Sequence, residues 1–294
     1  MTRFFMPARM PVLESASSMD LCKLCRLRDD LQESHYIPRF AYKASRGSRL
    51  KNQNPVVITP GRGVRQAQHQ MKDHVFCAGC EQRFNNGGEK WVLRRLPSDQ
   101  GQPCRLQDDL IKETPFYSAP GLDLYEGAKI PTFDMDQLVY FGASIFLRGA
   151  VHQWEIDGQR VAKVALNDHE EQLRLFLLGQ GPFPADMWLT TVIWPFKPVF
   201  VGALPPKPEH APGWNRYWFY ICGLAFVLNF GSAIPLDIKQ RCSQNTPQRV
   251  VTVERDFGLQ VWRFLRAVTE QGQTEQSRAM FKEIEKIRGA GAQR

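Results

Sequence analysis

Hydrophobic residues recur at helical spacing in the second half of the chain. The segment Met135–Trp154 places Leu138 and Phe141 on one broad side, as a buried amphipathic helix would. Three further segments predict helices by the same pattern: Asp168–Leu178, Arg255–Glu270 and Glu275–Arg288. The last two would close the chain.

Two runs between these helices have the composition of β-structure. Trp188–Leu204 and Tyr217–Phe230 are rich in aromatic and β-branched residues and are interrupted by Pro and Gly, which predicts strands or hairpins packed against the helices. The most apolar stretch, Tyr217–Leu228, has about half the length that a membrane-spanning helix needs. We therefore expect a mixed α+β domain over residues 101–294 and no membrane partner.

The first hundred residues have a different texture. They hold few large aliphatic side chains, so a structural metal would help this part to fold. Ala44–Gly63 predicts an extended basic loop around one short strand, Val56–Thr59, and Asn85–Gly88 predicts a turn after a short helix. The polar stretch Pro97–Pro103 marks a domain boundary, so we expect the first domain to span residues 1–100.

The basic charge is concentrated in this first part. The chain carries a net charge of +8, and residues 1–110 hold 18 Lys and Arg against 11 Asp and Glu, whereas residues 111–294 hold 20 against 19. Residues 36–75 carry eight basic side chains and one acidic one. Such a block is typical of a surface for polyanions such as nucleic acids. A solvated basic loop without a partner is the alternative.

Four of the seven cysteines form two Cys-x-x-Cys pairs, Cys22/Cys25 and Cys77/Cys80. Two thiolates from each of two tight turns complete a tetrahedral zinc site. The beginning of the chain lacks the apolar run and cleavage site of a secretory signal. We therefore expect a cytoplasmic protein whose thiols hold metal and form no disulfides. In the plainest interpretation the zinc only holds a small domain together.

The residues around the cysteine pairs carry a resemblance to a known family. Glu33-Ser34-His35-Tyr36-Ile37-Pro38 lies between the pairs, and Glu81 follows Cys80 directly. This order resembles the HNH, or His-Me finger, endonucleases, most closely the zinc-stapled four-cysteine branch that includes phage endonuclease VII. The resemblance implies a ββα-metal fold, treble-clef-like, in which a His ends the first strand and the second cysteine pair begins the helix.

A group of bacterial HNH-like proteins resembles the chain over about residues 20–95. These proteins read Ser-His-Ile-Ile-Pro, then a basic stretch with Arg and Gln, then Leu-Cys-x-x-Cys-Glu-x-x-Phe and a further Glu. The matching residues are Ser34, His35, Ile37, Pro38, Arg65, Gln66, Cys77, Cys80, Glu81, Phe84 and Glu89.

The resemblance implies a phosphodiesterase centre. His35 takes the place of the general base, Glu81 that of the catalytic-metal ligand, and Ser34 that of a second ligand, usually Asp. Glu33 and Glu89 are further candidate ligands. A hard oxygen ligand suits Mg²⁺ or Mn²⁺. The candidates for phosphate contact are Arg39, Lys43 and Arg65. DNA is favoured over RNA as the substrate because the family points to it.

Two functional hypotheses follow. The first is a metal-dependent HNH endonuclease, an effector of bacterial antiphage defence whose C-terminal domain senses a signal or binds a partner protein. The alternative is a catalytically inert zinc-finger protein that binds DNA or acts as an adaptor, since Ser34 replaces the usual Asp and the middle Asn of the HNH signature has no clear counterpart. The variant His35→Ala distinguishes them, because only the endonuclease would lose an activity.

Overall fold

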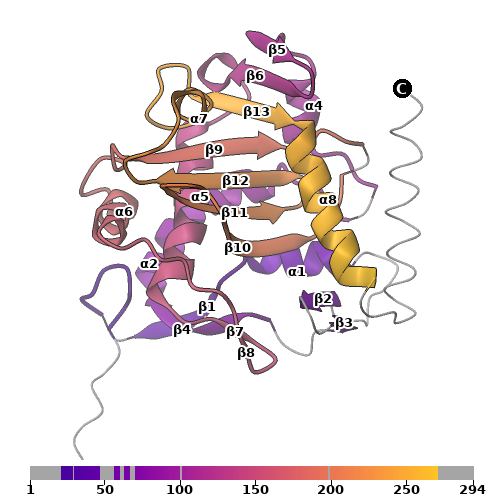
Figure 1. Ribbon diagram of the computed structural model, residues 1–294. Helices are drawn as coiled ribbons and strands as arrows, with labels where there is room; N and C mark the ends of the chain where they lie inside the picture. The colour runs from indigo at the N-terminus through magenta and orange to yellow at the C-terminus, as the bar shows by residue number, and fades with distance from the viewer. Residues whose placement is uncertain are drawn as a thin grey trace, which may run out of the picture.

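The computed structural model describes residues 21–28, 30–46, 56–59, 63–66, 70–99, 101–197 and 199–270. These residues form a mixed α+β fold, as the sequence predicts (Figure 1). Its centre is a seven-stranded sheet in the order β10 (Ala203–Glu209), β11 (Asn215–Ile221), β12 (Leu224–Phe230), β9 (Met187–Ile193), β13 (Val250–Glu254), β6 (Leu122–Glu126) and β5 (Tyr117–Ala119). Neighbouring strands are antiparallel except β9 and β13.

Helices cover both faces of this sheet, α8 (Arg255–Glu270) in front of the strands and α5 (Met135–Val151) behind them (Figure 1). On β11, Phe219 packs against Phe141 of α5 at a ring distance of 6.4 Å, and its neighbour Trp218 packs against Phe257 of α8 at 5.6 Å. Successive strand residues point to opposite faces. The run Tyr217–Phe230 is therefore apolar on both sides because both sides are buried.

Most of the predicted strands and helices that fall in the described part are confirmed, several with shifted ends; Trp188–Leu204 contributes most of β9 and the first two residues of β10. Tyr217–Phe230 folds into the hairpin β11–β12, whose turn residues Cys222 and Gly223 have φ values of 44° and 94°. A two-residue hairpin loop of the I′ type requires two such left-handed residues. Helix α6 (His169–Leu178) ends in a left-handed Gly179, a common helix C-cap.

Helix α5 stops three residues before the predicted end at Trp154. Asp134 caps its start by accepting the backbone N–H of Gln137. Beyond Val151 the chain turns back, and the Trp154 ring stacks on Tyr36 at a centroid distance of 5.2 Å. A contact distant in sequence therefore ends the helix.

The N-terminal unit, defined here as the described residues between 21 and 99, contains a β-β-α arrangement. Strand β1 (Leu31–His35) pairs antiparallel with β4 (Lys72–Cys77), and α2 (Ala78–Phe84) follows β4 directly. The helix α1 (Arg39–Arg46) and the hairpin β2 (Val56–Thr59) to β3 (Gly63–Gln66) lie between the paired strands in sequence. Helix α1 occupies the start of the predicted loop, and residues 47–55 and 60–62 lie outside the described part.

The predicted turn at Asn85–Gly88 is wrong. These residues continue α2 as a π-helical turn, η2 (Asn85–Glu89), which leads into α3 (Lys90–Leu93). The glycines serve close packing: a Cβ atom on Gly88 would lie 2.5 Å from the carbonyl oxygen of Gln137 in α5. The helix therefore passes α5 at a distance that a side chain would prevent.

A continuous hydrophobic core joins the N-terminal unit to the sheet. The division into domains at residue 100 stays a prediction, and the predicted helix Glu275–Arg288 lies outside the described residues. The remaining short elements are α4 (Arg105–Leu110), η3 (Gly127–Lys129), β7 (Glu155–Ile156), β8 (Gln159–Arg160) and α7 (Leu236–Gln240). None of the helices in the described part combines the length and apolar character needed to cross a bilayer.

Candidate metal centre and adjoining histidine

The two Cys-x-x-Cys pairs come together in space. The sulfur atoms of Cys22, Cys25, Cys77 and Cys80 all lie within 4.8 Å of one another, and the Cys25 and Cys77 sulfurs are 3.8 Å apart. A tetrahedron with metal–sulfur bonds of 2.3 Å has edges of about 3.8 Å. The four cysteines are thus positioned to hold one metal ion, and the donor set suits a structural zinc.

Local backbone structure explains this placement. In the first pair the chain turns so that the Arg26 N–H donates to the Cys22 carbonyl at 2.8 Å, with Arg26 in the left-handed region at φ 58°. In the second pair Cys77 ends β4 and Cys80 lies in the first turn of α2. The Cys77 N–H donates to the Cys22 sulfur at 3.3 Å, which favours a thiolate there.

The electrostatics of the cluster agree with a cation site. The hydrogen bond from the Cys80 thiol lowers the pKa of Cys22 to about 4, whereas that same interaction and burial raise the pKa of Cys80. Without a cation, then, the cysteines share a small number of negative charges. Binding of a metal to all four requires the remaining protons to leave.

His35 ends β1 opposite Lys72 of β4, whereas Leu31 at the start of the strand pairs with Cys77 of the cluster. Nε2 of His35 lies 2.9 Å from Oε1 of Gln70, so Nε2 donates and Nδ1 keeps its lone pair. Partial burial lowers the pKa of His35 below the ordinary 6.5, and the Gln70 bond raises it in part. The imidazole is therefore neutral near pH 7, the form in which histidine accepts a proton.

Glu81 and Glu89 meet a guanidinium from the far half of the sequence. Arg148 of α5 is 1% exposed, and its Nη2 lies 2.6 Å from the Glu89 carboxylate and 3.8 Å from Glu81 Oε2. Its Nη1 donates to the backbone carbonyl of His35 at 3.2 Å. The Arg148 side chain therefore contacts the backbone carbonyl of His35, the predicted base, and the carboxylates of Glu81 and Glu89. Sequence analysis singled out no role for Arg148.

The two carboxylates differ in their distance from Arg148. Its Nη2 lies 2.6 Å from Glu89 and 3.8 Å from Glu81, and Oε1 of each carboxylate is buried without a well-aligned hydrogen bond from the described residues. A buried carboxylate oxygen without a donor is costly unless a cation compensates it. Of the two, Glu81 is the better candidate to bind a divalent ion.

Ser34 and Glu33 are occupied by other contacts. The Ser34 hydroxyl is buried, donates to the Gln32 carbonyl at 3.3 Å and accepts the Phe76 N–H at 3.1 Å, at a bulge between β1 and β4. Glu33 is exposed and pairs with Lys72 at 2.5 Å, which lowers its pKa. These contacts describe a serine that completes strand pairing and a glutamate in a surface ion pair.

The candidate phosphate contacts divide into two groups. Arg39 and Lys43 are exposed and lie four residues apart on α1, so they share one face of the helix that follows His35. Arg65 lies on β3, where its backbone pairs with Val57; its side chain lies outside the described part. Arg39 and Lys43 thus form a basic face beside the histidine.

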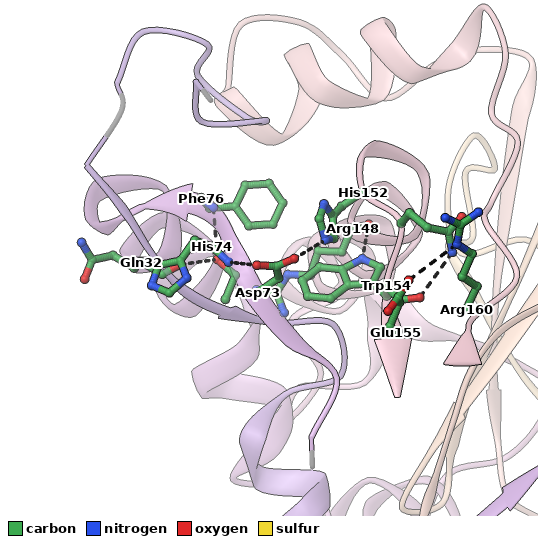
Figure 2. A network of polar contacts seen from close by, with 11 residues as sticks. Gln32, Asp73, His74, Phe76, Arg148, His152, Trp154, Glu155 and Arg160 are labelled. Carbon is green, nitrogen blue, oxygen red and sulfur yellow. Dashed lines mark hydrogen bonds and ion pairs between the residues drawn. The ribbon is translucent and has the colours of Figure 1, made fainter. Parts of the chain in front are cut away.

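A second set of contacts joins the N-terminal unit to the end of α5. The Trp154 indole N–H donates to the Arg148 carbonyl at 2.7 Å, and Asp73 of β4 lies 3.0 Å from His152 (Figure 2). His152 had no sequence partner that could be identified, because Asp73 belongs to the other half of the chain. Likewise, nothing in the sequence near Arg148, in the last turn of α5, indicates that its side chain points into the protein.

Comparison of this chain with protein-family models, with curated proteins and with solved structures finds no match. The resemblance to HNH endonucleases therefore rests on the residues and motifs themselves. The sequence and the geometry described above carry the functional argument.

Proposed function

We propose that the protein is a metal-dependent endonuclease of the HNH type that hydrolyses phosphodiester bonds in nucleic acid, with DNA favoured as substrate. The observation that carries this proposal is the position of Arg148, which contacts the His35 carbonyl on one side and the Glu81 carboxylate on the other. The base and the metal ligand implied by the resemblance thus lie around the same side chain.

His35 acts as the general base in this proposal. Its neutral imidazole is oriented by Gln70, and Nδ1 is the nitrogen that would take a proton from water as the water attacks phosphorus. Gln70 accepts a hydrogen bond from Nε2 and so fixes the tautomer in which Nδ1 is unprotonated, as acceptors beside one ring nitrogen do in other histidine sites.

Glu81 is the residue proposed to hold the catalytic cation. Mg²⁺ or Mn²⁺ bound there would stabilise negative charge on the phosphate and the leaving oxygen. The zinc proposed for the four cysteines would fix the position of Glu81, because Cys80 precedes it in the first turn of α2. Glu89 stands in this scheme as the partner of Arg148.

Arg39 and Lys43 supply the proposed backbone contacts to nucleic acid. Both are exposed on α1, which begins four residues after His35. Contacts of this kind neutralise phosphates without reading sequence, so binding should weaken steeply as salt rises.

The test is cleavage of supercoiled plasmid by the zinc-loaded full chain with Mg²⁺ or Mn²⁺. We expect nicking that requires the added divalent ion and is lost in His35→Ala. The matched control is His74→Ala, which removes an exposed histidine from the neighbouring strand β4. Metal analysis should find equal zinc in all three proteins. Loss of cleavage in both variants, or retention in both, would contradict the role of His35.

The inert alternative has one observation in its favour. Arg148 already supplies a positive charge to the two carboxylates, which lowers their demand for a divalent ion. In that case the wild-type protein would shift DNA in a gel and cut nothing at any Mn²⁺ concentration. Arg39→Ala combined with Lys43→Ala would then reduce binding, and His35→Ala would not.

A further inference from the structure

Arg148 differs from the other charged residues near His35 in being buried and in coming from the helix beneath the sheet. Its side chain is 2% exposed, and the guanidinium lies over the Phe84 ring at 4.6 Å. A buried guanidinium is stable only when its donors and its charge are matched. Its contacts with Glu89 and the His35 carbonyl match its charge and its two terminal nitrogens, while Nε has no hydrogen-bond partner among the described residues.

The charges around Arg148 are unequal in a way that distinguishes its two partners. The guanidinium contacts Glu89 at 2.6 Å and Glu81 at 3.8 Å, so its charge is compensated mainly by Glu89. One positive charge faces two carboxylates, which leaves one negative charge in the group. That charge belongs chiefly to Glu81, because its carboxylate lies farther from the guanidinium than that of Glu89.

The backbone of Arg148, like its side chain, makes a contact outside its own helix. Its carbonyl lies in the last turn of α5, where no intrahelical donor follows, and it accepts the Trp154 indole N–H at 2.7 Å. Trp154 in turn stacks on Tyr36, the residue after His35. Arg148 thus connects α5 to the end of β1 through its side chain and, by way of Trp154, through its backbone; Figure 2 shows the Trp154 hydrogen bond.

We propose that Arg148 is a positioning residue of the cleavage centre and that Glu89 is its counter-ion. The guanidinium holds the end of β1 at a set distance from Glu81, and Glu89 keeps the guanidinium from neutralising Glu81. This inference rests on the proposed function. It also means that the centre is assembled from both halves of the chain, because α5 belongs to the part that carries the sheet.

The first test variant is Arg148→Lys. Lysine keeps the charge but lacks the planar fork that reaches Glu89, Glu81 and the His35 carbonyl together. We expect cleavage at saturating Mn²⁺ to fall about 100-fold, since small displacements of catalytic groups have effects of that size.

The second test variant is Glu89→Gln, and its expected signature differs. With Glu89 neutral, the guanidinium has Glu81 as its remaining carboxylate partner, so Glu81 becomes a weaker ligand. The half-saturating Mn²⁺ concentration should rise about tenfold, both in cleavage and in direct Mn²⁺ titration followed by electron paramagnetic resonance. A purely structural role would leave this midpoint unchanged in the molecules that remain folded.

Arg174→Lys is the matched control. Arg174 of α6 is also buried, pairs with Glu171 at 2.7 Å and donates to the Leu24 carbonyl in the N-terminal unit. Glu171 is 46% exposed and Leu24 lies between Cys22 and Cys25, so this variant reports what the loss of another Arg–Glu contact does to folding of the N-terminal unit, with zinc content measured alongside. We expect a comparable decrease in melting temperature and a wild-type Mn²⁺ midpoint.

The outcomes separate the two proposals. Cleavage by the wild type with the Glu89→Gln midpoint shift supports both. If the wild type cleaves DNA and every variant has the same half-saturating Mn²⁺ concentration as Arg174→Lys, the role of Arg148 and Glu89 is overturned. The proposed nuclease activity is then still supported. Mn²⁺ binding that Glu89→Gln weakens, without any cleavage, overturns the nuclease and supports the cation site. Absence of Mn²⁺ binding by the zinc-loaded wild type overturns the inference.

Discussion

The sheet and the N-terminal unit both bury rings that pack on one another, Phe219 on Phe226 and Phe76 on Phe84, but the interior of the N-terminal unit also holds four cysteines and a guanidinium donated by α5. Phe226 is fully buried and lies 5.0 Å from the Phe219 ring, while Cys22 and Cys77 are as deeply buried as any residue of the core. From this difference we expect the sheet to hold its shape by packing. We expect the N-terminal unit to require, in addition, its four cysteines and the side chains supplied by α5.

The strongest test of this contrast is Cys80→Ser. Structural zinc contributes about 10 kcal/mol or more to folding in small zinc domains, so loss of a ligand should unfold the N-terminal unit. The sheet should stay folded, because none of its strands supplies a ligand to the four-cysteine site and its own rings remain packed. Hydrogen exchange should show β1, β4 and α2 losing protection while β11 and β12 keep theirs.

Cys104→Ser is the control for that experiment. Cys104 is buried but lies outside the four-sulfur cluster. We expect one zinc per chain in the wild type and in Cys104→Ser, and less than one in Cys80→Ser. Equal zinc in both variants would refute the site.

The converse test is Phe226→Ala. Removing a fully buried phenyl ring costs about 3–5 kcal/mol, and here it would destabilise the sheet while the cysteine cluster keeps its ligands. Urea unfolding should show the loss, and zinc content should stay at the wild-type level. Leu236→Ala, at a leucine 69% exposed, should change stability by less than about 0.5 kcal/mol.

The same contrast explains which features the sequence could predict. The runs around Tyr217–Phe230 and Met135–Trp154 follow from local periodicity, and the sheet strands and α5 appear close to the predicted places. The four cysteines follow from ligand spacing, which is also local. Each of these patterns has a physical cause within a short window of the chain.

The parts that sequence reasoning missed depend on contacts between distant segments. Gly87 and Gly88 look like a turn, but their lack of side chains lets η2 pass close to α5. Arg148 looks like a helix-end cation, yet its partners are three elements of the N-terminal unit. The residues next to these glycines and to Arg148 in the sequence do not indicate either role, because each role depends on which distant segment packs against them.

Trp154→Phe tests the join between the two parts. The substitution keeps a ring to stack on Tyr36 but removes the donor to the Arg148 carbonyl, and an unpaired buried carbonyl costs about 1–3 kcal/mol. We expect lower stability and less protection at β1. Trp214→Phe loses a hydrogen bond to the Asn229 side chain at 3.1 Å, but lies in the bend just before β11 and should leave β1 protected. If both variants affect β1 equally, Trp154 does not join the two parts.

Acid should weaken the N-terminal unit before the sheet. Burial holds the pKa of His35 below the 6.5 of an unfolded histidine, so the unfolded chain binds the proton more readily. His35 therefore lowers stability as the pH falls from above 6.5 through its folded pKa. For the proposed nuclease, the acid limb of the rate profile should have its midpoint below pH 6.5.

His35→Gln should remove this pH-dependent part of the stability and leave the remainder. The groups that influence His35 are Gln70, Glu33, Arg39 and Lys72, and of these only Glu33 would titrate in the acid range. Its pKa is lowered by Lys72, so it contributes at lower pH. An unchanged profile in His35→Gln would assign the acid sensitivity to another group.

The smallest effect is expected from Asp73→Asn at the edge of the join. Asp73 lies 3.0 Å from His152, but its side chain is 56% exposed, so solvent screens the interaction. Exposed pairs of this kind contribute at most about 1 kcal/mol, and Asn can still accept the His74 N–H that Asp73 now accepts. Stability should change by less than about 1 kcal/mol in urea unfolding at low salt and by less still at high salt. A loss as large as that of Trp154→Phe would mean that surface charge, and not the buried contacts of Arg148 and Trp154, fixes β4 against the end of α5. The small loss expected here would assign the join to its interior, where one tryptophan and one arginine from the part that carries the sheet contact the N-terminal unit.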